Sequence, residues 1–347
     1  MIKDRAVRIL VGIVAAVLVC AALSEAQSII APVVFALFVI AIVWPLQKGL
    51  QRFLPGVIAA LATLVVTLAV VGTIISLVVW GFAHVGQWVF ANAARFQALY
   101  GQAHDWLEGH GFVMASIITE HFDVRWLLLV FQDLSSRMQS LASFLVVTFV
   151  FVILGLLEVD IVKRQLAGLR GGTFGPFMLS AGADIGTKMQ RYMMVRTLMS
   201  LATGVVVWAF TLASGMELAT AWGVIAFSMN YIPFIGPFVA TLLPTLFALV
   251  QFESWQSAVF VFVCLNIIQF LSGSYLEPRI AGKALAASPF MVLFAVFFWS
   301  FLWGVPGAFI GVPLLIAALT LCAHHPASRP VADLFSGRAP PEETPAH

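Results

Sequence analysis

The stretch Asn230-Tyr231-Ile232-Pro233-Phe234-Ile235-Gly236-Pro237 interrupts an apolar run that extends from Ala219 to Val250. Its two prolines each remove a backbone N–H donor and clash with the preceding helical turn, and its glycine lowers the helix propensity further. A regular helix therefore cannot continue through this stretch. In a lipid bilayer, the freed backbone groups must bind protein groups or line a water-filled cavity. We expect either a candidate site at membrane depth or a surface loop between two spans.

The composition is typical of a membrane protein. Of the 347 residues, 61% are hydrophobic and 10% are charged, whereas soluble domains carry about 25% charged residues. A chain this long and this apolar predicts several spanning helices. The net charge of +2 gives no indication of a nucleic-acid partner. The three cysteines lie in apolar segments, and their spacing fits neither a disulfide framework nor a metal site.

Three apolar stretches in residues 1–82 predict three spans. The first ends near Leu23, and the next two cover residues 29–46 and 57–82. The turn after the second stretch carries Lys48 and Arg52, whereas the turn after the first has no basic residue. Because basic loops stay in the cytoplasm, this distribution predicts a cytoplasmic N-terminus. The alternative is that the first apolar stretch is a cleaved signal peptide. A second apolar stretch follows it immediately, which favours a retained first span.

Residues 83–138 are less apolar, and we expect them to form amphipathic helices on the external side. Their histidines and acidic residues invite a metal-site interpretation, but no His-x-x-x-His or Cys-x-x-Cys spacing occurs. The favoured interpretation is a solvated helical face, broken at Gly109-His110-Gly111.

Residues 139–191 predict the fourth span, at about 141–157, and then a basic cytoplasmic segment. This segment is the most basic part of the chain. Its stretch 170–175 is rich in glycine, yet no Gly-Lys-Ser/Thr closes it, so a turn between interfacial helices is expected rather than a nucleotide loop. Without a recognisable ATPase module, transport is expected to be passive or driven by an ion gradient.

The transport core is predicted at 192–322, and it begins with a fifth span at about 192–214. Its broken segments 219–250 and 289–322 are too long for one span and short for two. A continuous helix of 32 residues is about 48 Å long, against a hydrocarbon core of about 30 Å. Each segment is therefore either one broken span or a re-entrant hairpin. The loop 273–288 carries Arg279 and Lys283, and only the hairpin places it in the cytoplasm, so loop charge favours hairpins.

The two broken segments also suggest an internal repeat. Pro237 and Pro244 are seven residues apart, as are Pro306 and Pro313, and each first proline adjoins a glycine. Paired Gly/Pro-interrupted segments are typical of the binding sites of secondary transporters. The alternative is a chance match. The remaining residues, 323–347, are expected to form an unstructured cytoplasmic tail.

Three blocks of the last 160 residues occur in a recognisable order and spacing. They are the stretch 230–237, then Tyr275-Leu276-Glu277-Pro278-Arg279-Ile280-Ala281-Gly282-Lys283 with Pro289, and finally Trp303-Gly304-Val305-Pro306-Gly307-Ala308-Phe309-Ile310-Gly311-Val312-Pro313. These blocks resemble the autoinducer-2 exporter (AI-2E) family of bacterial membrane proteins, and the N-terminal half resembles it in layout only. The resemblance implies eight membrane segments, a homo-oligomer with a pentamer as the expected form, and export of a small molecule. Some relatives are associated with sodium/proton exchange, and a shared fold does not settle the substrate.

The candidate pathway residues are polar or helix-breaking, because such groups are costly in a bilayer and are functional by default. They are Asn230, Pro233, Gly236 and Pro237 at the first break, Asn266 and Gln269 in the seventh apolar run, Glu277 and Arg279 after it, Gly304, Pro306, Gly307 and Gly311 at the second break, and Asp184, Arg191 and Arg196 on the cytoplasmic side.

Each candidate has a structural alternative. Asn266 and Gln269 share a helix face and can bind a solute or join two helices. Glu277 and Arg279 can form a gating ion pair or proton site, or a solvated pair of little energetic value. Arg196 can pair within the bundle or anchor the chain at the interface. The glycines permit close backbone approach.

The predicted fold class is an all-α polytopic membrane protein with about eight membrane segments. The predicted function is secondary transport that exports a small polar or amphiphilic metabolite, such as an autoinducer-2-like signal, across the bacterial inner membrane by alternating access. A sodium/proton antiporter is the first alternative, and a passive channel or membrane scaffold is the alternative of another class. Because no enzyme motif occurs in the apolar segments, we expect no enzymatic activity. No cofactor is expected beyond H+ or Na+ as coupling ion, and the expected partners are the lipid bilayer, the solute and further copies of the chain.

Overall fold

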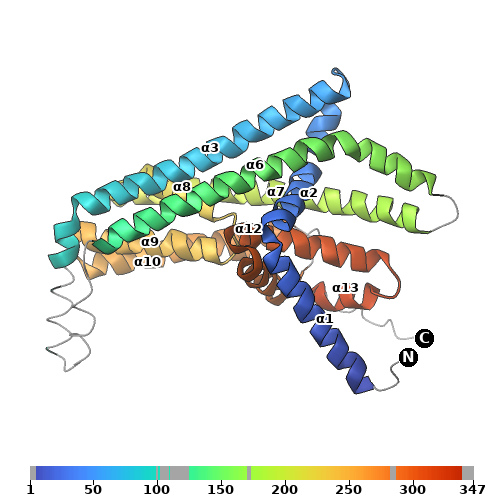
Figure 1. Ribbon diagram of the computed structural model, residues 1–347. Helices are drawn as coiled ribbons and strands as arrows, with labels where there is room; N and C mark the ends of the chain where they lie inside the picture. The colour runs from blue at the N-terminus through green and yellow to red at the C-terminus, as the bar shows by residue number, and fades with distance from the viewer. Residues whose placement is uncertain are drawn as a thin grey trace, which may run out of the picture. The chain divides into compact units, whose positions relative to one another are not determined.

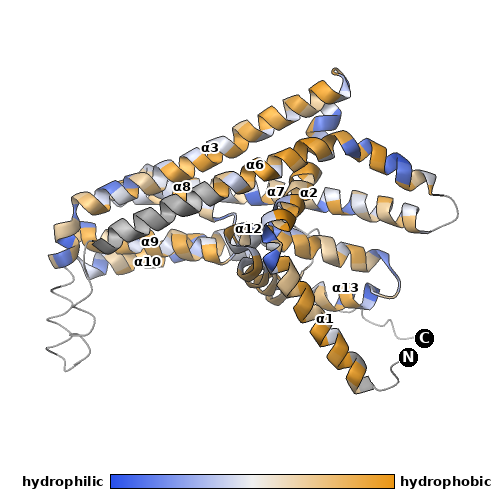
Figure 2. Cartoon of the chain, in the orientation of Figure 1, coloured by the Kyte–Doolittle hydropathy of each residue, from blue (hydrophilic) through white to orange (hydrophobic). Residues whose placement is uncertain are grey.

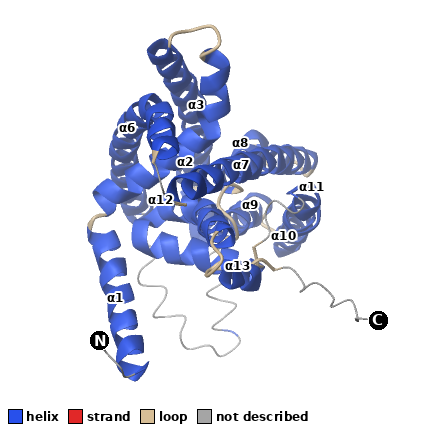
Figure 3. Cartoon of the chain, turned by 90° about the vertical axis from the view of Figure 1, so that its right-hand side faces the viewer, coloured by secondary structure: helices blue, strands red, loops and turns tan. Residues whose placement is uncertain are grey.

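The computed structural model describes residues 5–98, 101, 109, 125–169, 173–281 and 287–337. Over these ranges the chain is helical and forms no strand (Figures 1 and 3). Seven of the described helices are long and apolar enough to cross a membrane. Figure 2 shows apolar residues along most of their length. The chain is therefore a multi-pass membrane protein, and the predicted all-α fold class is confirmed.

The helices follow one another in the order of Figure 1. They are α1 (Arg5–Glu25), α2 (Gln27–Leu50), α3 (Gly56–Ala91), α6 (Arg125–Gly168), α7 (Phe174–Ala213), α8 (Ala219–Met229), α9 (Ile235–Phe252), α10 (Trp255–Phe270), the π-helix η1 (Leu271–Leu276), α11 (Glu277–Ala281), α12 (Pro289–His324) and α13 (Arg329–Phe335). The chain divides into two compact units, whose boundaries fall inside α3, α6, α7 and α11. Unit 1 comprises Met1–Leu68, Phe144–Met194 and Ala281–His347, and unit 2 comprises Ala69–Ser143 and Val195–Ile280.

The predicted fourth and fifth spans are parts of longer helices. α6 has 44 residues and α7 has 40, so each is about 60 Å long or more. Hydropathy detects only the apolar part of such a helix, whereas the backbone hydrogen bonds continue into its polar ends. Residues 170–172 of the predicted glycine-rich turn, and His104, His110 and His121 of the predicted external segment, lie outside the described residues. The five-segment division made from the sequence follows hydropathy and remains a prediction.

In unit 1, α12 folds back on itself at Gly304. This residue has φ 62° and ψ −141°, a conformation that glycine alone adopts readily. A Cβ atom at Gly311 would lie 2.8 Å from the carbonyl oxygen of Ala295, although sixteen residues of straight helix would separate them by about 24 Å. The second broken segment is therefore a helical hairpin, as predicted.

The turn of this hairpin lies in an apolar, largely aromatic core. The buried residues of this core are Ala31, Phe38, Met189, Leu302, Trp303 and Ile310. Phe35 packs against Phe309 with ring centroids 5.7 Å apart, and the Trp303 indole donates a hydrogen bond to the Leu23 carbonyl at 3.1 Å. Close packing of this kind, rather than exclusion of water, holds helices together in lipid.

The segment after α12 forms the short helix α13, which packs against α12. The Ser288 backbone N–H donates to the Phe335 carbonyl at 3.0 Å, and Ala332 is buried. The prediction of an unstructured tail is therefore wrong for residues 329–335. Pro330 lies in the first turn, where proline favours a helix, and the contact with α12 stabilises this short element. Residues 338–347 lie outside the described residues.

In unit 2, α7, α8, α9 and α10 form a four-helix bundle. α8 and α9 pack together as a hairpin, and α9 packs along α10. α7 approaches α8 where a Cβ at Gly204 would lie 2.9 Å from the Gly223 carbonyl oxygen. α7 reaches α10 where the Phe210 and Phe260 ring centroids are 6.1 Å apart. Each helix thus contacts two others around a common interior, and the first broken segment is a hairpin within this bundle.

Candidate functional site

The interior of the unit 2 bundle has an apolar end and a polar end. The apolar end contains Val207, Met216, Trp222, Ile225, Ala226, Phe247, Ala248, Val261 and Leu265. The other end holds a group of buried polar side chains: Arg196, Ser200 and Thr203 on α7, Ser228, Asn230 and Tyr231 at the end of α8, and Gln269 and Ser272 on α10 and η1. We call this second group the polar end. It is the candidate functional site.

α7 supplies one continuous stripe to the polar end. Arg196, Ser200 and Thr203 follow one another at spacings of four and three residues, which places them on one helix face. All three are buried. Sequence reasoning selected Arg196 and missed the other two, because serine and threonine are common in apolar helices. Their spacing from Arg196 is the signal that could have revealed them.

Arg196 forms a buried ion pair with Glu277. Its Nη1 atom lies 2.7 Å from both carboxylate oxygens, and the two side chains are 6% and 19% exposed. A buried charge is tolerated only when it is paired and hydrogen-bonded. Arg196 therefore pairs within the bundle, the first of its two predicted roles, and the pair fastens α11 to α7.

The predicted ion pair between Glu277 and Arg279 is not formed. Residues two apart on a helix point in different directions, so their side chains do not meet. The Arg279 guanidinium instead lies over the Tyr275 ring, 4.0 Å from its centroid. The carboxylate finds its partner 81 positions earlier in the chain, a distance at which local spacing carries no information.

The first break is attached to α7 by two hydrogen bonds. Asn230 Nδ2 donates to Ser200 Oγ at 3.3 Å, and the Tyr231 hydroxyl lies 3.1 Å from Thr197 Oγ1. These contacts fall within one turn of Arg196. The break, α11 and α7 thus meet over a short length of α7, and the predicted candidate Asn230 lies in the polar end together with Arg196 and Glu277.

The backbone of the break is tightly constrained. Phe234 has φ 63° and ψ −52°, and the Ile235 N–H donates to the Pro233 carbonyl at 2.7 Å, which makes a strained γ-turn. A Cβ at Gly236 would lie 1.8 Å from the Met229 carbonyl oxygen, so only glycine fits there. Pro237 lies in the first turn of α9, where a missing N–H breaks no helical hydrogen bond.

The structure separates Asn266 from Gln269. Asn266 is exposed, and its Nδ2 donates to the Phe262 carbonyl of its own helix at 2.7 Å. Gln269 is buried at the polar end. Between Gln269 and Glu277 the chain forms the π-helix η1, a conformation found frequently at functional sites.

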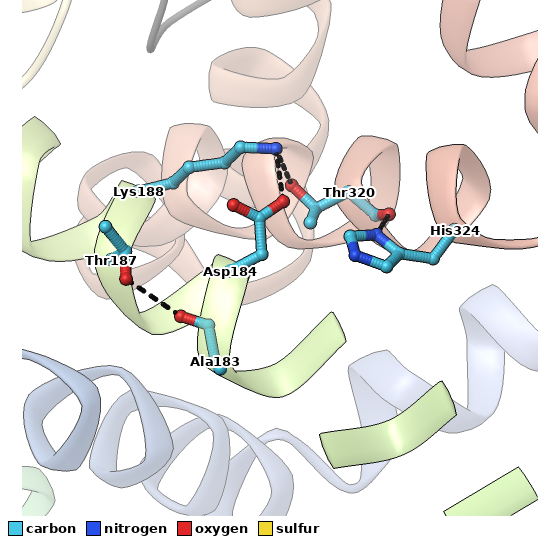
Figure 4. A network of polar contacts seen from close by, with 6 residues as sticks. All are labelled: Ala183, Asp184, Thr187, Lys188, Thr320 and His324. Carbon is cyan, nitrogen blue, oxygen red and sulfur yellow. Dashed lines mark hydrogen bonds and ion pairs between the residues drawn. The ribbon is translucent and has the colours of Figure 1, made fainter. Parts of the chain in front are cut away.

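The other predicted candidates lie in unit 1. Pro306 and Gly307 belong to the α12 hairpin described above, and a Cβ at Gly307 would lie 1.8 Å from the Trp299 carbonyl oxygen. Asp184 pairs with Lys188 at 2.8 Å, and Lys188 donates to Thr320 of α12 at 3.2 Å (Figure 4). Arg191 is exposed. Lys188 thus joins α7 to α12, and none of these predicted candidates belongs to the polar end.

A groove of about 350 Å³ opens where α7 crosses α8 in unit 2. Leu77, Leu201, Trp208 and Phe227 are among its lining residues, and almost all of its surface is apolar. It suits hydrocarbon rather than a polar solute, so the polar end remains the better candidate site.

Comparison with known proteins decides the family. The model of the AI-2E family transporter matches residues 9–326, which is most of the chain. The chain belongs to the AI-2E transporter family. This confirms the resemblance drawn from the three sequence blocks, and it makes the protein a membrane transporter.

The relatives of this AI-2E transporter carry transport names. The AI-2 transport protein TqsA of Escherichia coli is 27% identical over 309 residues, which cover 86% of this chain and 87% of the relative. A putative transport protein of Haemophilus influenzae is 25% identical over 321 residues, 89% of this chain and 90% of the relative. A putative transport protein of Borreliella burgdorferi is 31% identical over 175 residues, and this match spans about half of each chain, 50% and 48%.

Proposed function

We propose that this AI-2E transporter is a secondary transporter that exports a small polar or amphiphilic metabolite, autoinducer-2 or a molecule like it, across the bacterial inner membrane. The observation that carries the proposal is the buried Arg196–Glu277 pair beside the Asn230 break. Placing two charges inside an apolar bundle is costly, and such groups in membrane proteins mark solute or ion pathways. The transport name of the E. coli relative supports autoinducer-2 as the first solute to test.

Alternating access can use the contacts that meet on α7. Glu277, Asn230 and Tyr231 bind Arg196, Ser200 and Thr197, all within five residues of α7. A movement of the α8–α9 hairpin or of α11 relative to α7 exchanges these polar contacts for contacts with a solute.

Sodium/proton antiport is the second candidate function, and the position of Glu277 favours it. This carboxylate is largely buried and has one cationic partner. Its protonation removes the charge that holds Arg196, so proton binding couples directly to release of α11 from α7. The coupling ion is then H+, exchanged against Na+.

Counterflow in proteoliposomes tests the proposal. Autoinducer-2 on the trans side should accelerate exchange of labelled autoinducer-2, because a carrier returns faster when loaded; a channel shows no such acceleration. Glu277→Gln should abolish the exchange. Asp184→Asn is the matched control, since it removes the carboxylate of a more exposed ion pair in unit 1 and should leave exchange unchanged. Sodium-dependent proton flux with no autoinducer-2 exchange would instead support antiport.

We further propose that both termini lie in the cytoplasm, as the basic residues near the first turns indicate. In a cysteine-free background, Ser28→Cys, in the turn region between the first two predicted spans, should react with an impermeant thiol reagent added outside intact cells. Ala327→Cys, in the turn before α13, should react only after the cells are opened. The reverse result would overturn this orientation.

A further inference from the structure

Buried polar atoms without partners are concentrated in unit 2. Among the described residues, five buried side-chain atoms have no hydrogen-bond partner. Four of them are in unit 2, namely Thr203 Oγ1, the amide oxygen and nitrogen of Gln269, and Arg196 Nε, and the fifth is Gln47 Nε2 in unit 1. The first two residues are as inaccessible as the apolar core, with exposures of 0% and 9%. Unpaired buried polar groups are rare in native proteins, and those that occur call for a bound water, ion or ligand.

Thr203 and Gln269 lie at the same level of the bundle. α7 and the α10–α11 segment run antiparallel, because Phe210 contacts Phe260 at one end and Arg196 contacts Glu277 at the other. Thr203 is halfway between the two contacts on α7, and Gln269 is next to the halfway point on the other segment.

The next turn of each helix supports this alignment. Val207 follows Thr203 by one turn, Leu265 precedes Gln269 by one turn, and both belong to the same buried apolar cluster. The two polar side chains therefore begin the polar end about one turn beyond that cluster, on the buried faces of α7 and α10.

We infer that Thr203 and Gln269 form the binding position for an uncharged hydrogen-bonding group of the transported solute, a hydroxyl or an amide. The inference rests on the proposed transport function. A threonine hydroxyl donates and accepts, and a glutamine amide offers one donor group and one acceptor. Neither residue can balance a charge, and the ion pair nearby is already neutral, so a charged group would be unpaired here.

Thiol modification tests the position directly. In a variant lacking Cys20, Cys264 and Cys322, Thr203→Cys and Gln269→Cys should react with the uncharged reagent 2-hydroxyethyl methanethiosulfonate at least ten times faster than Val207→Cys and Leu265→Cys. The two controls are also buried, and they lie one turn away on the same faces. Equal rates at all four positions would overturn the inference. Saturating autoinducer-2 should slow the reaction at the first two positions.

A second measurement separates solute binding from packing. Thr203→Val keeps the shape and removes the unpaired hydroxyl, so the melting temperature should stay the same or rise, while the KM for autoinducer-2 should rise at least tenfold. A lower melting temperature with an unchanged KM would show a structural role and overturn the inference. If wild-type protein shows no autoinducer-2 exchange, the proposed function fails, and the modification rates still test the position.

Discussion

The two broken segments share a close approach of a glycine to a backbone carbonyl, and they differ in the side chains that surround it. In each, a Cβ on a glycine after the turn would lie 1.8 Å from a carbonyl oxygen before it, at Gly236 and Met229 in one and at Gly307 and Trp299 in the other. The first break contacts polar side chains of α7, whereas the second contacts aromatic residues and Leu23. A broken helix in a membrane is therefore not by itself a candidate site. The side chains that surround the break, polar in the first case and aromatic in the second, make that distinction.

The comparison also limits the proposed internal repeat. The prolines pair Pro237 with Pro306, whereas the close glycine contacts pair Gly236 with Gly307, and these two alignments differ by two residues. The hairpins share a close contact between a glycine and a carbonyl without sharing one residue register. The repeat remains a prediction.

The largest expected effect on stability comes from breaking the ion pair in unit 2, compared with breaking the ion pair in unit 1. Glu277→Ala leaves Arg196 buried and unpaired, so the free energy of unfolding in detergent should fall by about 3–5 kcal/mol. Asp184→Ala breaks the more exposed pair in unit 1 and should cost about 0–1 kcal/mol. The double variant Arg196→Leu with Glu277→Leu should regain most of the stability and remain inactive in transport. Similar decreases in the free energy of unfolding for Glu277→Ala and Asp184→Ala would contradict this difference between the two ion pairs.

Alanine at the close glycines should affect both hairpins alike. Gly236→Ala and Gly307→Ala each force a backbone shift, and each should lower the free energy of unfolding by about 3 kcal/mol. Gly186→Ala in α7 is the control: a Cβ there meets no atom within 4 Å, so the variant should gain up to about 1 kcal/mol. Thermal unfolding of the purified variants measures the difference. Tolerance at one glycine alone would show that the two turns differ in backbone as well as lining.

At both turns, glycine should be more stable than alanine at the residue with positive φ. Phe234→Gly relieves a positive φ, so it should be about 1 kcal/mol more stable than Phe234→Ala, which loses the same side chain but keeps the strain. Gly304→Ala introduces such strain and should cost about 1–2 kcal/mol. Chemical denaturation compares the three variants. If Phe234→Ala and Phe234→Gly unfold together, the first turn is not strained.

Two variants with small and similar effects on stability should differ most clearly in transport. Asn230→Ala and Trp303→Phe each remove one hydrogen bond at a break, which is worth about 1 kcal/mol. Only Asn230→Ala should reduce autoinducer-2 exchange, by at least tenfold, because it alone changes the polar end. Equal transport by the two variants would remove the functional distinction between the breaks.

Local features of the fold could be predicted from the sequence, and distant pairings could not. The hairpins follow from proline, glycine, segment length and two loop charges, all of which act close to where they occur. The partner of Glu277 lies 81 residues away on another helix, and the stripe that Ser200 and Thr203 make with Arg196 matters only because other helices cover it. The lengths of α6 and α7 also exceed what hydropathy detects, since polar helix ends remain hydrogen-bonded outside lipid.

The π-helix η1 has a consequence for how the ion pair is aimed. An α-helix turns about 100° per residue. A π-helical segment contains one extra residue, so the side chains that follow it are rotated by about 100° about the helix axis. Glu277 is the first residue after η1. Deleting Gly273 should restore an α-helical path and rotate the carboxylate about 100° away from Arg196, with α10 left intact. The one additional residue in η1 thus determines whether the Glu277 carboxylate points toward Arg196.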